Sequence, residues 1–226
     1  MGQYYRILNL DKKEYLSPYD FGCTAKLMEF SYIARDLQTN SFLSTAIALM
    51  RTEWQNDRVV VVGDYTDYDW ATDEPKNQDD KFFLRALSTE PGFEFIAKKR
   101  NDPNNPDYHG YNTLYDADEW GFTERTDYTN VHVPPYLCNR HTKEYVELTS
   151  LPLEWKANNQ DGDENYISIF PFPLLLAVGN GLGGGDYRGA NKNYVGAWTL
   201  TADGVYFANT LPKGYLEYPI VFSEVL

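Results

Sequence analysis

Apolar residues near the N-terminus alternate with polar ones over short stretches typical of β-strands. Residues 4–9 predict a strand and residues 13–16 its hairpin partner, with Asp11 and Lys12 in the turn. Residues 58–62, an arginine followed by four valines, form the clearest strand pattern in the chain. A continuous β-branched run predicts a strand that is buried on both faces and lies in the centre of a sheet.

The first hairpin pattern occurs a second time. The spacing Asn-x-x-x-Lys-Glu-Tyr begins at Asn9 and again at Asn139. Asparagine favours such a turn because its side chain bonds the local backbone and tolerates a positive φ. Two similar hairpins, at 4–16 and 136–148, explain the repeat by turn chemistry alone. The alternative is an internal duplication, with two related halves that face each other.

Three short segments are predicted to be helices. Apolar residues recur every three or four positions over 42–54, and residues 40–41 supply an N-cap. A second helix is predicted over 81–87. A third, over 174–178, has Pro173 at its first position, where proline is tolerated.

Strand patterns outnumber helical ones in the rest of the chain. Residues 197–201 and 205–208 predict another hairpin, and residues 218–225 a final strand. Polar loops are expected over 100–135 and 156–165. Because strands follow one another in sequence, we predict an α+β fold: a largely antiparallel mixed sheet with two or three short helices and long irregular loops. No linker separates two domains, so residues 1–226 are predicted to form one.

Composition narrows the functional classes. The 226 residues are 42% hydrophobic and 16% aromatic, which is too rich in packing side chains for a disordered chain. A net charge of −13 argues against nucleic acid and anionic membranes as partners. The longest apolar run, 167–178, is short of the ~20 residues that a membrane helix needs. Two cysteines and no signal region predict a cytoplasmic protein.

A glycine-rich stretch at 179–189 is the first candidate ligand site. A phosphate-binding loop places its glycines before a helix, whereas here a short helix is predicted before them. The chain has no GK[ST] motif, and no GxGxxG follows a predicted strand. One interpretation is a helix C-cap followed by a tightly packed loop. The other is a ligand-contacting loop, whose candidate residues are Gly183, Gly184, Gly185, Asp186 and Arg188.

An acidic segment at 64–74 is the second candidate. It follows the valine strand, and its candidate ligands are Asp64, Asp67 and Asp69. Carboxylates could hold a divalent metal there, but their spacing fits no known metal pattern, so a solvated turn is the preferred interpretation and no cofactor is predicted. Half a zinc site at Cys138 and His141 lacks its other half. No catalytic residue is assigned, because no enzyme motif is present.

Aromatic residues in the 100–135 segment form a candidate surface for a protein partner. They either cover the core of the protein or contact another chain. These residues are Tyr108, Tyr111, Tyr115, Trp120 and Phe122.

Several blocks of the sequence resemble a widespread family of uncharacterised proteins of bacteria and their phages. They are MGQYY at the N-terminus, NLDKKEYLxP at 9–18, DRVVVVGDY at 57–65 and GNGxGGGDY at 179–187. The resemblance implies no activity, cofactor or partner. Leu182 stands where the family pattern has a basic residue, which weakens an anion-binding interpretation.

Two hypotheses follow for function. The first is a non-enzymatic acidic module, of phage or mobile-element origin, that binds a protein through the aromatic segment. The second is an enzyme or small-ligand binder, whose pocket is formed by the 64–74 and 179–189 segments together.

Overall fold

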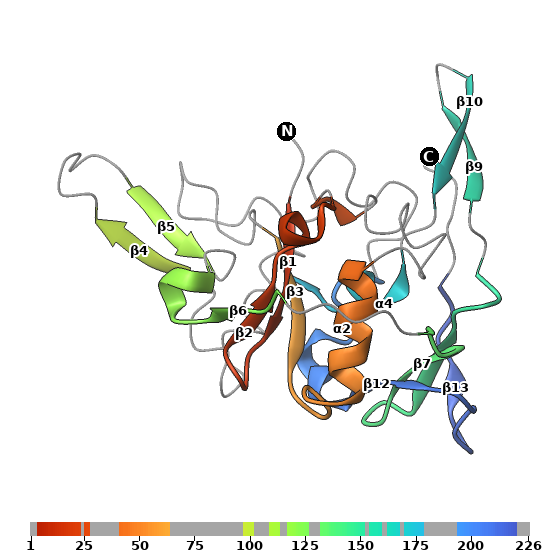
Figure 1. Ribbon diagram of the computed structural model, residues 1–226. Helices are drawn as coiled ribbons and strands as arrows, with labels where there is room; N and C mark the ends of the chain where they lie inside the picture. The colour runs from red at the N-terminus through yellow and green to blue at the C-terminus, as the bar shows by residue number, and fades with distance from the viewer. Residues whose placement is uncertain are drawn as a thin grey trace.

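The computed structural model is an α+β structure with mixed, largely antiparallel sheets, which confirms the predicted class (Figure 1). It describes residues 4–23, 25–27, 41–63, 97–101, 109–113, 117–126, 132–151, 154–159, 162–167, 170–178 and 194–220. The helix predicted over 81–87 lies outside these ranges. Within them, no helix combines the length and the apolar character that a membrane crossing requires.

Among the described residues the first sheet has five strands, and the valine strand lies inside it. In spatial order they are β11 (Ala177–Val178), β3 (Val59–Gly63), β1 (Tyr5–Asn9), β2 (Glu14–Leu16) and β6 (Thr123–Glu124). Every residue of β3 is buried, as its β-branched run predicts. β3 pairs antiparallel with β1 and parallel with β11.

The second sheet has four strands in the part of the chain that the structure describes. In spatial order they are β12 (Val205–Ala208), β7 (Tyr136–Asn139), β8 (Glu144–Glu147) and β13 (Leu216–Glu217). β12, β7 and β8 are antiparallel, and β13 runs parallel to β8. The strand predicted over 218–225 is not found in its described part: β13 ends at Glu217, residues 218–220 are not in a strand, and the rest of the prediction lies outside the described residues.

The two sheets contain the same arrangement of four strands. We call β3-β1-β2-β6 the first unit and β12-β7-β8-β13 the second unit. Strand directions agree throughout. The Lys13 carbonyl accepts a hydrogen bond from the Thr123 N–H at 2.8 Å, and the Lys143 carbonyl accepts one from Leu216 at 2.9 Å. Both lysines have positive φ, 54° and 56°. That the two units arose by duplication stays a prediction.

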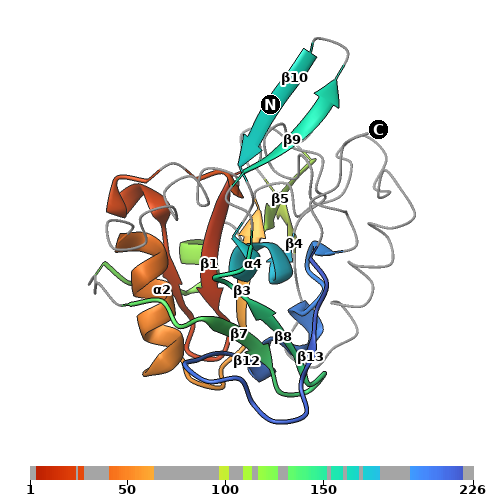
Figure 2. The same cartoon turned by 90° about the vertical axis from the view of Figure 1, so that its right-hand side faces the viewer.

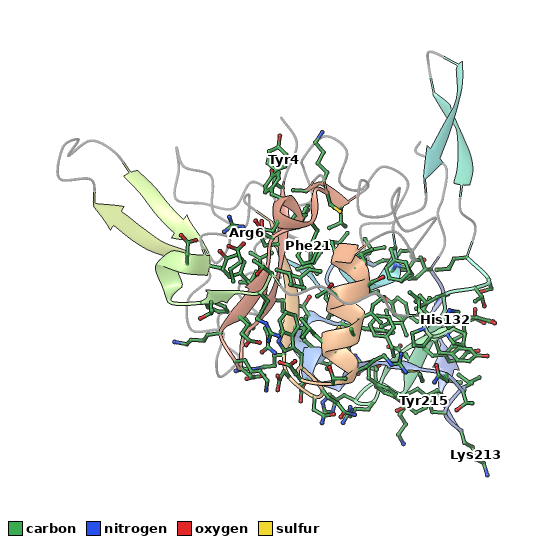
Figure 3. All side chains as sticks on the ribbon, viewed as in Figure 1. Tyr4, Arg6, Phe21, His132, Lys213 and Tyr215 are labelled. Atoms are coloured by element: carbon green, nitrogen blue, oxygen red, sulfur yellow. The ribbon has the colours of Figure 1, made fainter. Side chains whose placement is uncertain are left out.

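Helices in the described residues are short. They are η1 (Pro18–Phe21), α2 (Ser41–Arg51), η2 (Ala117–Trp120), α4 (Pro171–Leu175) and η4 (Thr199–Gly204). α2 ends three residues before the predicted position, because the Trp54 N–H bonds the Leu49 carbonyl at 2.7 Å and turns the chain toward β3. Phe21 lies between β1 and α2, with its ring 5.7 Å from that of Phe42 (Figure 3).

Two segments were predicted wrongly. The strand expected over 197–201 is a turn followed by η4, since backbone bonds of Thr199 to Gly196 and of Thr201 to Trp198 close tight turns there. β12 pairs with β7 instead. The polar loop expected over 156–165 is largely a two-stranded ribbon, β9 (Glu154–Asn159) with β10 (Gly162–Ile167). The polar sequence contains no strand pattern, and the strand pair is defined by its backbone hydrogen bonds.

The described apolar residues of both units belong to one hydrophobic core. α2, which leads into β3, packs against β12 of the second unit, while α4 and η4 pack against β3 of the first unit. The rings of Phe172 in α4 and Phe207 in β12 meet edge to face at 5.6 Å. Figure 2 shows α4 beside β3 at the centre of the molecule. Each unit therefore buries its apolar face partly against the other.

Candidate functional site

The strands that precede the two predicted ligand segments in the sequence are neighbours in the first sheet. Ala177 of β11 lies opposite Val61 of β3, and Val178 lies opposite Val62, in parallel register. The acidic segment starts directly after Gly63, and the glycine stretch starts directly after Val178. Neighbouring strands lie ~4.8 Å apart, so the described ends of β3 and β11 are close to each other. Carboxyl ends of parallel strands are a frequent place for ligand sites.

A strand, and not the predicted helix, directly precedes the glycines. α4 ends at Leu175, and the Leu176 carbonyl accepts a hydrogen bond from the Val61 N–H at 2.8 Å, which aligns the chain with β3. The helix predicted over 174–178 was therefore placed too late. No GxGxxG spacing was expected to follow a strand. Such a spacing does follow β11, and its glycines are Gly179, Gly181 and Gly184. The described residues that come next, from Tyr194, form turns and η4.

Most of the predicted site residues lie outside the described residues. These are Asp64, Asp67, Asp69, Gly183, Gly184, Gly185, Asp186, Arg188, Tyr108 and Tyr115. Tyr111 lies in β5 (His109–Thr113), which forms a ribbon with β4 (Ala97–Asn101), and Trp120 ends η2. Phe122 is partly buried and packs against the core.

Cys138 and His141 do not point to a metal. Burial raises the pKa of the Cys138 thiol to about 11. The His141 ring lies 3.0 Å from an Asp203 carboxylate oxygen, at the end of η4. Within the ranges that the structure describes, no group of three or more His, Cys, Asp or Glu side chains is placed to hold a metal ion.

Each hairpin turn is held by its asparagine. The Asn9 Oδ1 accepts the N–H groups of Asp11 and Lys12, both at 3.0 Å, and the amide donates to Asp57 at 2.8 Å. Both asparagines are fully buried. In the second turn, Asn139 accepts the N–H groups of His141 and Thr142 and donates to the Thr201 hydroxyl at 2.7 Å.

A second correspondence joins a glutamate to a tryptophan in each unit. Glu14 accepts a hydrogen bond from the Trp54 indole N–H at 2.6 Å, and Glu144 accepts one from Trp198 at 3.1 Å. Both tryptophans are buried and both glutamates are partly buried. The repeated Lys-Glu-Tyr contained the glutamates, but the tryptophans follow them by different spacings, so sequence reasoning did not connect the pairs.

The first unit adds a cation to its glutamate. The Arg125 guanidinium lies 3.1 and 3.2 Å from the two Glu14 carboxylate oxygens, and 3.0 Å from Glu53. The hydrogen bond to Glu53 is the main cause that raises the pKa of Arg125, and it lowers the pKa of Glu53. The guanidinium thus neutralises a partly buried carboxylate.

The second unit has aromatic rings at the matching position. The Tyr218 N–H bonds the Tyr145 carbonyl at 2.7 Å, just as the Arg125 N–H bonds that of Tyr15 at 2.8 Å. The Tyr218 ring meets those of Trp198 at 5.5 Å and Tyr194 at 5.9 Å. Burial, and secondarily the Glu144 carboxylate, raises the pKa of Tyr218. Tyr218 and Tyr194 are each partly exposed.

Comparisons of the chain with protein-family models, curated proteins and solved structures found no match.

Proposed function

We propose that this protein is a non-enzymatic module that binds a protein partner, and that its two ribbons take part in the contact. The observation that carries the proposal is the position of the ribbons: β4–β5 and β9–β10 extend away from the body in different directions (Figure 1). Among the described residues, each ribbon strand pairs only with its own partner strand.

Within the described residues, the outer edges of the ribbon strands are unpaired. A two-stranded ribbon is at best marginally stable in water, and its outer edges present backbone N–H and C=O groups. Addition of a strand from another chain satisfies these groups, which is a common mode of peptide recognition. The ribbons therefore gain stability from a partner.

Side-chain types in the ribbons suit a protein contact. Tyr111 is opposite Lys99 in the register of β4–β5, and Trp155 is opposite Tyr166 in β9–β10. Tyrosine and tryptophan are enriched at binding hot spots. β4 also contains the three consecutive basic residues at 98–100 in a chain of net charge −13, so an acidic surface on the partner would complement this ribbon.

Native mass spectrometry of the protein purified from its own host tests the proposal. We expect a complex with a second protein, and we expect Tyr111→Ala or Trp155→Ala to raise its Kd at least about tenfold, the effect of one hot-spot residue. Leu211→Ala, an exposed apolar position in the turn after β12, is the matched control and should leave the complex intact. A bare chain at every concentration, or equal loss with the control, would contradict the proposal.

A second function is favoured by the pairing of Val62 with Val178. The acidic and glycine-rich segments follow adjacent strands in the sequence. A pocket for a small ligand or a divalent metal could therefore form from both segments close to the ends of these strands. Asp64, Asp67 and Asp186 are its proposed ligands. A bound mass that chelator removes, and that Asp64→Asn reduces but Glu217→Gln does not, would support this function. Unchanged mass under all these conditions would contradict it.

A further inference from the structure

We propose that the second unit contains a binding site for an alkylguanidinium cation, formed by the Glu144 carboxylate and the rings of Tyr218 and Tyr194. This site is distinct from the ribbons and from the β3–β11 edge. It goes beyond the proposed function, since a small molecule could occupy it even if no protein partner exists.

The first unit supplies the argument for the cation. Glu14 and Glu144 occupy the same position after the hairpin turn, and each accepts a tryptophan indole N–H. Glu14 also binds the Arg125 guanidinium through both carboxylate oxygens. Its equivalent, Glu144, is likewise partly buried and likewise accepts an indole N–H. The lone pairs of the Glu144 carboxylate that Trp198 does not use are therefore suited to a guanidinium, as those of Glu14 are.

Within the described residues, no cation of the chain reaches Glu144. The residue that replaces Arg125 at the matching backbone position is Tyr218. Lys213 precedes β13 in the chain, is exposed, and extends away from the body in Figure 3. No lysine or arginine of these ranges lies within ion-pair distance of the Glu144 carboxylate.

The aromatic rings favour a planar cation. Tyr218 meets Trp198 and Tyr194 at steep angles, 64° and 74°, so the three rings present faces in different directions. A cation over an aromatic face is attracted by the negative π surface, and a guanidinium can stack there as well. The Tyr218 hydroxyl is uncharged at neutral pH, as a tyrosine ordinarily is, so it can donate or accept a hydrogen bond without adding charge.

Nuclear magnetic resonance of the indole N–H groups tests the site directly. The chain has five tryptophans, so the Trp198 signal can be assigned with Trp198→Phe. We expect N-acetylarginine amide to shift the Trp198 signal saturably, whereas the Trp54 signal, whose glutamate already binds Arg125, should not move. The neutral citrulline analogue should shift neither. N-acetyllysine amide should bind less tightly than the arginine compound, because its ammonium cannot stack.

Variants separate the site from a general charge effect. Glu144→Gln retains an acceptor for the Trp198 indole but removes the charge, and should weaken binding at least about tenfold. Glu217→Gln removes the same charge from the residue next to Tyr218 and should have little effect. Tyr218→Arg supplies the guanidinium from the chain itself and should abolish the response to added arginine amide. If Glu144→Gln fails to fold, Tyr218→Leu tests the aromatic contribution.

The source of the cation follows from one further comparison. A peptide with a single arginine that binds at least tenfold more tightly than the amide would indicate an arginine on a protein, and equal binding a free alkylguanidine. The proposal is overturned if the Trp198 signal does not shift, if citrulline shifts it equally, or if the response survives in Glu144→Gln.

Discussion

Charged residues of the first hairpin turn bind groups from the segment before β3. The Arg58 guanidinium and backbone N–H both bond the Asp11 carboxylate, at distances between 2.5 and 2.8 Å. Partial burial opposes ionisation of Asp11, but the hydrogen bonds and the charge of Arg58 outweigh it and lower the pKa of Asp11. The Lys12 ammonium pairs with Asp57 at 3.0 Å.

This lowered pKa has a consequence for acid stability. Ionised Asp11 stabilises the fold above the unfolded-state pKa of ~3.9, and this stabilisation is lost as the pH falls through the lower, folded-state pKa. Asp11→Asn should decrease the free energy of unfolding by about 1 kcal/mol at pH 7, after allowance for solvent screening, and by less at acid pH. Urea denaturation of the protein and of the variant, at pH 7 and at acid pH, measures these two free-energy differences. Asp118→Asn, at an exposed carboxylate, should cost little; an equal cost of Asp11→Asn at both pH values would contradict the assignment.

Gly204 is required by space and not by backbone conformation. A Cβ at this position would lie 2.4 Å from the His141 ring and 2.8 Å from the buried Asn139 Oδ1. The His141 side chain can move, but Asn139 is fixed by its turn. We expect Gly204→Ala to destabilise the protein by about 2 kcal/mol, as overpacking usually does, measured by chemical denaturation. Addition of His141→Ala should recover only part of this loss; full recovery would show that Asn139 is not the obstacle.

At the scale of elements, each hairpin turn depends on one buried asparagine. Asn9 and Asn139 each accept two backbone N–H groups of their turn and donate to a side chain from the segment that precedes the neighbouring strand. The asparagine thus connects a local turn to a strand far along the chain.

Loss of either asparagine should therefore have a similar effect. We expect Asn9→Ala and Asn139→Ala each to decrease the free energy of unfolding by about 2 kcal/mol, because buried partners lose their hydrogen bonds. Thermal denaturation monitored by circular dichroism measures both. Thr142→Ala, in the same turn but exposed, should change stability little. A negligible effect of one asparagine variant beside a large effect of the other would contradict the structural equivalence of the turns.

Sequence reasoning was most successful where the element carries its own signal. The turns were predictable from asparagine spacing, and β3 from its valines, because turn chemistry and β-branching act locally. The end of α2 and the 3-10 turns of η4 were not predicted, and at both places a tryptophan indole also bonds a glutamate far away in the sequence. The ribbon β9–β10 was missed since its sequence is polar.

At the scale of the whole molecule, the two units share one core. α2 covers β12, and α4 and η4 cover β3, so neither unit buries its apolar residues alone. The cysteines are natural probes of this arrangement: Cys23 follows η1 and Cys138 lies in β7. Burial raises the pKa of both thiols, so both should react slowly in the folded protein.

A shared core predicts cooperative unfolding. Phe207→Ala, in the second unit, should decrease stability by about 3 kcal/mol, the usual cost of a large core truncation. The rate of modification of Cys23 by a thiol reagent should rise in parallel with that of Cys138, and calorimetry should give one transition. Single-cysteine variants separate the two rates. Faster modification of Cys138 alone would indicate that the units unfold independently.

The sequence by itself determined the α+β class, the buried valine strand and the two asparagine turns, since each depends on residues close together in the chain. It also placed the acidic and glycine-rich segments among the candidates by composition. Only the tertiary structure showed that the strands ending at Gly63 and Val178 are neighbours. It also placed Tyr218 at the position that Arg125 occupies in the first unit. Those positions depend on pairing between strands that are distant in sequence. Strands pair through backbone hydrogen bonds, and because nearly every residue type can make these bonds, the sequence contains no pattern that predicts which strands pair.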